Sequence, residues 1–254
     1  MTEHKEALRD LINASGFLFQ LRIEQEIKAA GPNQTGGWEF AAREHRWKDA
    51  EDGGEGFIDL ILKYGMGRMI IECKRVTDAN WVFLIPDKRS NMSRAHIPWT
   101  MRTNDKESIS DWHDFSVTPA SPEAAFCVVR GQGEKDTPML ERLSSQVLRS
   151  VESFANEELG YIDRSDRRPL IYFPVIVTNA TLHVCQFDPT LVDISTGQIN
   201  EANFQQVPCV RFRKSLSSGL PSRQPNRDIE KTNYNNERTI FVINSVALTE
   251  ILAQ

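Results

Sequence analysis

The hydrophobic positions along this chain follow two patterns, the periodic spacing of helices and the continuous apolar runs of buried strands. Helical spacing runs through 3–30, with a break near 13–16, and again through 140–159. Ser15 is the expected N-cap of the second helix, and Gly31-Pro32 is its expected stop signal. Short apolar runs predict strands at 38–47, 57–62, 69–76, 81–85, 124–130, 169–178, 181–187, 207–212 and 239–244, with a further short helix at 247–252. This order predicts an α/β protein.

Two long polar segments separate these elements. Residues 86–122 mix lysine and arginine with tryptophan, which predicts a loop that either packs over the core or faces nucleic acid. Residues 216–238 are rich in Ser, Pro, Asn and Arg, so we expect a mobile segment there. Pro174 falls inside the strand expected at 169–178. Because proline cannot donate a ladder hydrogen bond, this strand is expected near a sheet edge, or to begin at Val175.

The stretch 56–76 has the pattern of a β-hairpin, because two apolar runs flank a short segment that contains Gly65 and Gly67. A primed two-residue turn led by Gly65 would place Asp59 directly opposite Glu72. A loop of three or five residues would instead put these two carboxylates on opposite faces of the sheet.

Charged side chains inside these apolar strands need partners. Strand alternation points Glu72 and Lys74 to the same side. Carboxylates that face each other across a sheet repel, and burying them unpaired is unfavourable. A divalent cation together with the Lys74 ammonium group would balance them. Alternatively, Glu72 and Lys74 form a solvated ion pair on an edge strand. The continuous apolar flanks favour burial, since half-exposed strands alternate.

An aspartate on one strand, Asp59, followed on the next strand by Glu72-Cys73-Lys74, resembles the signature of the PD-(D/E)xK nuclease superfamily, which has the restriction-endonuclease-like fold. The proline that usually precedes the first acid is absent, and Ile58 stands in its place. The resemblance implies an α/β fold with a mixed central sheet flanked by helices.

The same resemblance implies the organisation of the chain and its activity. A nuclease-like core would occupy 1–188, with an insertion after the third strand at about 78–138. A C-terminal β-rich extension at 189–254 would pack on the same domain. The implied activity is Mg²⁺-dependent hydrolysis of phosphodiester bonds by an endonuclease, most often on DNA, in bacterial restriction, antiviral defence or repair.

The resemblance also assigns roles to the hairpin residues. Asp59, Glu72 and the backbone carbonyl of Cys73 would hold Mg²⁺, with Mn²⁺ as a substitute. Lys74 would orient or deprotonate the attacking water, or stabilise the charge that develops on the phosphate.

The first helix of the superfamily commonly supplies a further acid to the catalytic site. Glu24 is the candidate acid and metal ligand, because it falls within the apolar arc of the helix. Gln20, four residues earlier on the same arc, is the alternative as an amide, and Glu24 would then lie at the helix margin. Gln146 is a second-tier candidate, because many members carry a glutamine on the later helix. The tyrosine that often follows four residues later is here Ser150.

Composition narrows the setting in which such an enzyme would work. The chain has 254 residues and a formal net charge of -5, which argues against a protein that coats nucleic acid nonspecifically. Its four cysteines lack the spacing of a zinc site or a disulfide framework, which indicates a reducing cytoplasm. The N-terminus is polar and no apolar run is long enough to span a membrane, so a cytoplasmic location is expected.

Basic residues identify the expected contacts to nucleic acid. Arg75 and, in the C-terminal region, Arg211, Arg213 and Lys214 are candidate phosphate contacts, and a solvated surface is the alternative. The expected partner is double-stranded DNA, with RNA left open. Since the chain has no P-loop, a separate ATPase or helicase is a candidate partner, as is a second copy in a homodimer. A function of a different class is a catalytically inactive nuclease-like module that binds nucleic acid or a partner protein.

Overall fold

The structure is a computed structural model, and it describes residues 2–49, 53–77, 80–86, 91–103, 107–129, 138–161, 167–216 and 228–254. The elements in chain order are α1 (Thr2–Ala14), α2 (Phe17–Gln34), β1 (Glu39–Lys48), β2 (Glu55–Tyr64), β3 (Gly67–Lys74), β4 (Asn80–Pro86), β5 (Met92–Arg102), β6 (Ser108–Ser121), β7 (Glu123–Ala124), β8 (Phe126–Val129), α3 (Met139–Tyr161), β9 (Leu170–Thr178), β10 (Thr181–Phe187), η1 (Pro189–Leu191), β11 (Asn203–Gln206), β12 (Cys209–Ser215), α4 (Ile229–Asn236), β13 (Glu237–Asn244), η2 (Ser245–Ala247) and α5 (Leu248–Leu252).

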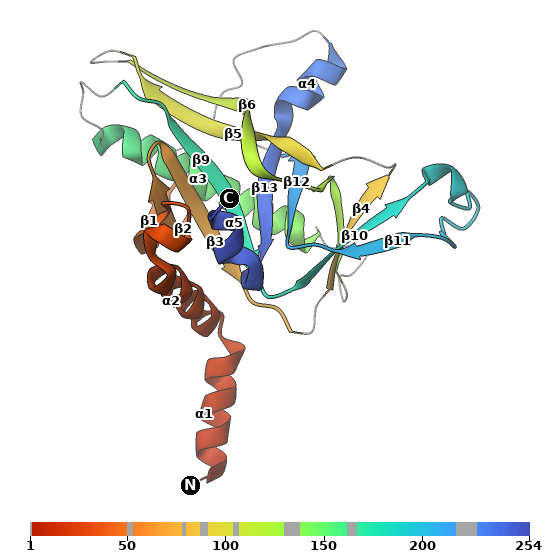
Figure 1. Cartoon of the computed structure of the whole chain (residues 1–254), viewed down its shortest axis with the longest axis horizontal. Helices are drawn as coiled ribbons and strands as arrows, with labels where there is room; N and C mark the ends of the chain where they lie inside the picture. Colours follow the sequence, from red (N-terminus) through yellow and green to blue (C-terminus); the bar gives the residue numbers. More distant parts are fainter. Residues whose placement is uncertain are drawn as a thin grey trace.

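The centre of the molecule is a mixed sheet, which has nine strands within the described ranges (Figure 1). Its strand order is β1-β2-β3-β9-β13-β12-β7, and β5 and β6 join it through β9. β3, β9 and β13 are parallel neighbours, whereas β1, β2 and β3 are antiparallel. A smaller sheet has the order β11-β10-β4-β8. The protein is therefore a mixed α/β fold in which helices flank a mixed sheet. This confirms the predicted α/β class with its mixed central sheet.

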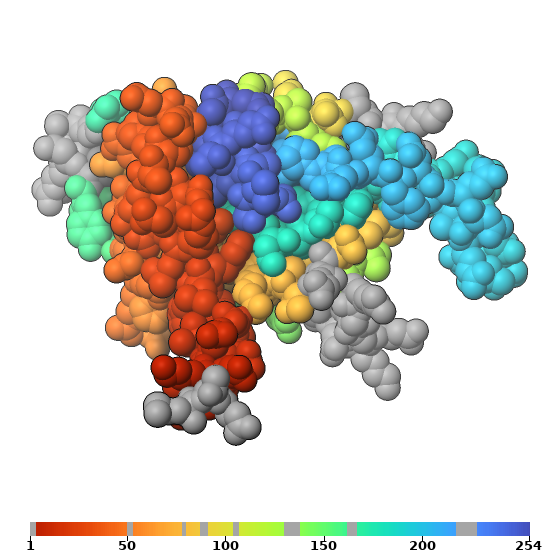
Figure 2. All heavy atoms as spheres, turned by 60° about the horizontal axis from the view of Figure 1, so that its bottom comes forward, coloured from red at the N-terminus to blue at the C-terminus, as the bar shows by residue number. Residues whose placement is uncertain are grey.

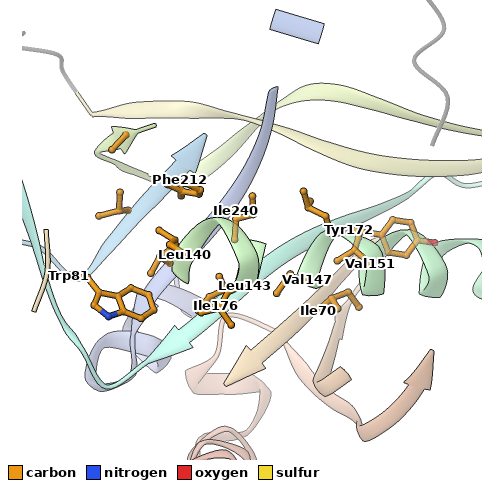
Figure 3. Close-up of a cluster of buried hydrophobic side chains, with 14 of the residues drawn as sticks. Ile70, Trp81, Leu140, Leu143, Val147, Val151, Tyr172, Ile176, Phe212 and Ile240 are labelled. Atoms are coloured by element: carbon orange, nitrogen blue, oxygen red, sulfur yellow. The ribbon is translucent and has the colours of Figure 1, made fainter. Parts of the chain in front are cut away.

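Helices cover both faces of the large sheet, so alternate residues of a strand enter two separate cores. Ile70 belongs to the core beneath α3, together with Leu143 and Val147, and Figure 3 shows these α3 side chains gathered against the sheet. The next residue, Ile71, belongs to the core on the other face, together with Ile23 of α2. Burial on both faces explains why these strands are apolar without alternation.

The predicted hairpin is confirmed. β2 and β3 pair as far as Tyr64 and Gly67, which leaves Gly65 and Met66 as a two-residue loop. Gly65 has φ = 51°, a left-handed conformation that glycine adopts without strain and that primed turns require. The turn therefore fixes the register that the sequence predicted.

The loop predicted at 86–122 is wrong. The segment forms two long antiparallel strands, β5 and β6, and β5 joins the large sheet where Trp99 pairs with Ile171. β6 carries mostly exposed or half-buried residues, so pairing along the whole length of β5 stabilises it without an apolar face. The segment 216–238 likewise contains a helix that was not predicted, α4. Residues 217–227 of the segment lie outside the described residues.

Local corrections have physical explanations. Pro174 lies in a central strand, because on one side of β9 the partner changes from β5, which ends its pairing at Ile171, to β13, which begins at Val175. A missing N–H is tolerated at such an interruption. Ser15 does not cap α2; Gly16 occupies that position. The helix also continues past its expected stop to Gln34, with a kink at residue 31.

The remaining differences concern the strand predicted at 124–130 and the C-terminal region. The strand predicted at 124–130 divides into β7 in the large sheet and β8 in the small one. β12 and β13, from the C-terminal region, are members of the large sheet. α5 packs beside α2, and Figure 2 shows the C-terminal segment next to the N-terminal ones. None of the described helices combines the length and apolar composition needed to cross a membrane.

Candidate functional site

Three carboxylates occupy one row across β1, β2 and β3. The β2–β3 ladder ends at the pair Leu60–Ile71, and its register, continued by one residue, places Asp59 opposite Glu72, as the hairpin pattern predicts. The register of β1 and β2 places Glu44 opposite Asp59 on its other side. Facing residues on adjacent strands have Cβ atoms about 4.5–5.5 Å apart, so the three positions are contiguous. We call Glu44, Asp59 and Glu72 the acid row.

The alternation of side chains between the two faces of β1 is interrupted at Glu44. Its φ is 49°, the one positive value among the described non-glycine residues. Before it, Arg43 reaches α2, where Nη1 lies 3.3 Å from Glu24 Oε2. After it, His45 reaches α3, where Nε2 lies 3.0 Å from Glu157 Oε2. In a regular strand residues two apart share a face, so Glu44 interrupts the alternation. Strained residues of this kind concentrate at functional sites.

Asp59 shows the same interruption on β2. Ile58 packs in the core beneath α3, whereas Leu60 packs in the core beneath α2. Between them, the Asp59 carboxylate accepts a hydrogen bond from the backbone N–H of Cys73, with an Oδ2–N distance of 2.7 Å. Asp59 is therefore held against β3, at the end of the strand that carries Glu72.

Gln20 of α2 closes one side of the acid row. Its side-chain nitrogen donates to a carboxylate oxygen of Glu44 and, at 3.3 Å, to the backbone oxygen of Asp59. The Gln20 side chain is itself buried. An amide donates hydrogen bonds without carrying a charge, so Gln20 orients Glu44 and leaves the negative charge of the row uncompensated.

The acid row holds its charge at a high energetic cost. Burial raises the pKa of Asp59 to about 6, and the charge of Glu44 acts in the same direction, while the Cys73 N–H and Lys74 oppose it. Burial also raises the pKa of Glu72 to about 7, reinforced by the charges of Asp59 and Glu44 and opposed by Lys74. Both carboxyl groups would be far more acidic in water.

Lys74 is the cation that the sequence places beside these acids. It is half-buried at the end of β3, and its charge lowers the pKa values of both Asp59 and Glu72. One ammonium group faces three carboxylates, and the pKa values of Asp59 and Glu72 stay raised, chiefly because both groups are buried. The structure thus brings together the three hairpin residues that the sequence singled out.

Glu24 and Gln146 lie apart from this arrangement. Glu24 is buried, and Lys28 and Arg43 both form ion pairs with its carboxylate. Burial alone would raise the pKa of Glu24, but these two cations outweigh burial and lower it. Gln20 is therefore the α2 residue that contacts the acid row. Gln146 is exposed on α3, and no interaction joins it to the acid row among the described residues.

The prediction that Arg211 contacts nucleic acid is wrong. Arg211 has no exposed surface, and its guanidinium group donates to Ser121 Oγ at 2.7 Å and to the backbone oxygens of Val117 and Pro119 at 2.8 and 2.9 Å. It ties β12 to the end of β6. A side chain committed in this way has no route to a phosphate.

Arg213 and Lys214 are also engaged within the protein. Arg213 is buried, with Nε 2.7 Å from Glu237 Oε2 and Nη1 3.3 Å from Asp114 Oδ1. Lys214 forms an ion pair with Glu141 of α3. The expected phosphate contact of Arg213 is therefore corrected to internal ion pairs, whereas Lys214 is half-buried and stays a candidate. Arg75, directly after β3, is half-buried and remains a candidate.

The acid row offers the ligands that a hard divalent cation prefers. Mg²⁺ takes oxygen ligands, and one or two carboxylates are the usual protein contribution. In the part of the chain that the structure describes, no three His, Cys, Asp or Glu side chains already stand in a metal-binding arrangement. A cation would have to draw the repelling carboxylates of the row together. Burial, and to a lesser degree the neighbouring carboxylates, raise the pKa values of Asp59 and Glu72, and a cation bound between them would lower both.

Comparisons of the chain with models of protein families, with curated proteins and with solved structures found no match. The functional assignment therefore depends on the geometry of the acid row and on its resemblance to a known motif.

Proposed function

We propose that this protein is a divalent-metal-dependent nuclease with a restriction-endonuclease-like core. The observation that carries the proposal is the acid row beside Lys74, in which Asp59 and Glu72 are half-buried and have raised pKa values. The chain order α2, β1, β2, β3, α3 and β9 agrees with the order that the resemblance implies if the strands β4 to β8 between β3 and α3 are an insertion. Bacterial restriction, antiviral defence or repair is the setting that the resemblance suggests.

Asp59 and Glu72 would hold the cation, with the Cys73 carbonyl beside them and Glu44 as a further oxygen donor. A bound divalent cation would neutralise charge that develops on the phosphate and lower the pKa of its bound water. Asp59 is pre-oriented by the Cys73 N–H, and Glu44 by Gln20. Such outer hydrogen bonds fix the direction of carboxylate lone pairs.

Lys74 would act on the substrate side of the acid row. Its ammonium group can donate to the attacking water or to a phosphate oxygen, and so position one against the other. Double-stranded DNA is the proposed substrate.

Cleavage assays with one lysine variant and a matched control test this proposal. Supercoiled, linear and single-stranded DNA would be incubated with Mg²⁺ or Mn²⁺, and RNA included as a fourth substrate. Lys74→Ala is expected to lower the cleavage rate at least about 100-fold, the range of a lost acid–base or charge-stabilising group. Lys63→Ala, an exposed lysine on β2 that pairs with Glu39 at 3.8 Å, is the control and should cleave normally. Full activity in folded Lys74→Ala would exclude Lys74 from the mechanism.

A second candidate function is a catalytically inactive module that binds nucleic acid or a partner protein. Gln20 favours it, because an amide stands on α2 where the superfamily commonly has an acid, while Glu24 is neutralised by Lys28 and Arg43. Under this alternative, the wild-type protein would cleave none of the four substrates with either metal, whether or not it binds DNA. That result would overturn the nuclease proposal.

A further inference from the structure

A cavity of about 370 Å³ lies against the large sheet beside α5, and no residue of the acid row lines it. Its walls include four aromatic side chains: Trp38, Tyr64, Phe173 and Phe241. Ligand pockets commonly have volumes of about 300–1,000 Å³ and mostly apolar, aromatic walls with a few polar groups. The cavity therefore has the size and composition of a small-molecule site.

The four rings form a connected wall. The centroid of Trp38 lies 5.9 Å from that of Tyr64 and 5.7 Å from that of Phe173, which contacts it edge to face. The centroid of Phe241 lies 6.1 Å from that of Phe173. Rings in mutual contact restrict one another, so this wall is formed before a ligand arrives.

Two glycines allow the rings to lie close to the backbone. A Cβ atom at Gly37 would lie 2.4 Å from the Tyr64 ring, and one at Gly67 would lie 2.8 Å from the Trp38 ring. Both distances are too short for any other residue without displacement of the ring. Glycine at positions 37 and 67 thus leaves room for the rings of Tyr64 and Trp38.

Hydroxyl-bearing residues of β6, together with Gln254, are the polar residues of the cavity lining. Ser116, Thr118 and Ser121 line it, and Arg211 holds this segment by donating to Ser121 Oγ and to the backbone oxygen of Val117. No Lys, Arg, Asp or Glu lines the cavity in the part of the chain that the structure describes. A charged ligand would therefore meet no oppositely charged side chain among these lining residues.

We propose that this cavity binds an uncharged, planar heteroaromatic molecule of nucleobase size, such as a nucleoside. Aromatic walls favour a flat ring by stacking, and the hydroxyl groups would satisfy its in-plane nitrogen and oxygen atoms. Binding at this cavity is independent of the acid row and of the proposed nuclease activity.

Calorimetric titration with adenosine, guanosine, cytidine and uridine tests the proposal on the full chain without added metal. At least one nucleoside is expected to bind saturably, and Tyr64→Ala to weaken it about tenfold, as expected for loss of one stacking partner. Phe126→Ala is the matched control, because Phe126 is 56% exposed and Tyr64 55%, and Phe126 does not line the cavity. The control should bind like the wild type. Absence of saturable binding by all four nucleosides would overturn the proposal, as would equal binding by wild type and Tyr64→Ala.

Discussion

Neutralising Glu72 should stabilise the metal-free protein at high pH. Burial and the charges of Asp59 and Glu44 raise the pKa of Glu72 from its usual 4.5 to about 7. Between these two pH values the folded protein binds more protons at this site than the unfolded chain does. The stabilisation that comes from the protonated group is complete below about pH 4.5 and is lost as the pH rises through 7. Above pH 7 Glu72 is ionised in the folded protein, which would be more stable with a neutral group at this position.

The size of the effect follows from the pKa. A rise from 4.5 to about 7 corresponds to about 3 kcal/mol of unfolding free energy. Glu72 is partly exposed, and water screens the charge, so the gain from Glu72→Gln should be nearer 2 kcal/mol. For a chain of this length that corresponds to an increase of about 4–8 °C in melting temperature at pH 8. At pH 4.5 the gain should be close to zero.

Thermal unfolding followed by circular dichroism, with EDTA present, measures this difference. Wild type and Glu72→Gln would be compared at pH 8 and at pH 4.5. Glu39→Gln is the control, because Glu39 is an exposed acid on β1, and its melting temperature should follow the wild type. If Glu72→Gln gained no stability at pH 8, or gained equally at both pH values, the acid row would not be strained by charge and the reasoning would fail.

Three further predictions concern the same protein. Millimolar Mg²⁺ should raise the melting temperature of the wild type at pH 8 and leave Glu72→Gln unchanged; equal shifts would place the cation elsewhere. Gln20→Ala, which releases Glu44 from its hydrogen bond, should raise the Mg²⁺ concentration needed for half-maximal cleavage by about 10–100-fold, and an unaltered Mg²⁺ titration would contradict its orienting role. Arg211→Leu should lower the unfolding free energy by at least about 3 kcal/mol in urea titrations, because several buried acceptors lose their donor. If Arg211 were instead an exposed phosphate contact, the substitution would change DNA affinity and leave stability intact.

The hairpin was predictable from the sequence because its determinants are local. Gly65 sets a two-residue turn, the turn sets the register, and the register places Asp59 opposite Glu72. Strands that are buried on both faces can also be predicted from their continuous apolar runs. The pairing of β5 with β6 had no such signal, since polar residues fill much of both strands.

Arg211 illustrates the opposite case. In the sequence it belongs to the most basic region, where arginine usually reaches solvent or phosphate. In the structure its guanidinium group satisfies backbone oxygens of Val117 and Pro119, more than ninety positions earlier in the chain. Contacts between residues so distant leave no local pattern, because each partner looks ordinary within its own segment. A buried arginine of this kind becomes visible only when the sheet brings β12 next to the end of β6.

Glu44 was missed for a different reason, and its position strengthens the interpretation of the acid row. β1 ends at Lys48 and β2 begins at Glu55, a separation too long for the sequence alone to fix their register and place Glu44 opposite Asp59. The positive φ of Glu44 is also unfavourable for a residue with a side chain. Strain in the backbone, a third carboxylate and two raised pKa values at one place all oppose stability in the metal-free chain. A cation bound by the acid row would relieve the electrostatic part of this strain, which is why the pH and Mg²⁺ dependence of stability tests the site independently of cleavage.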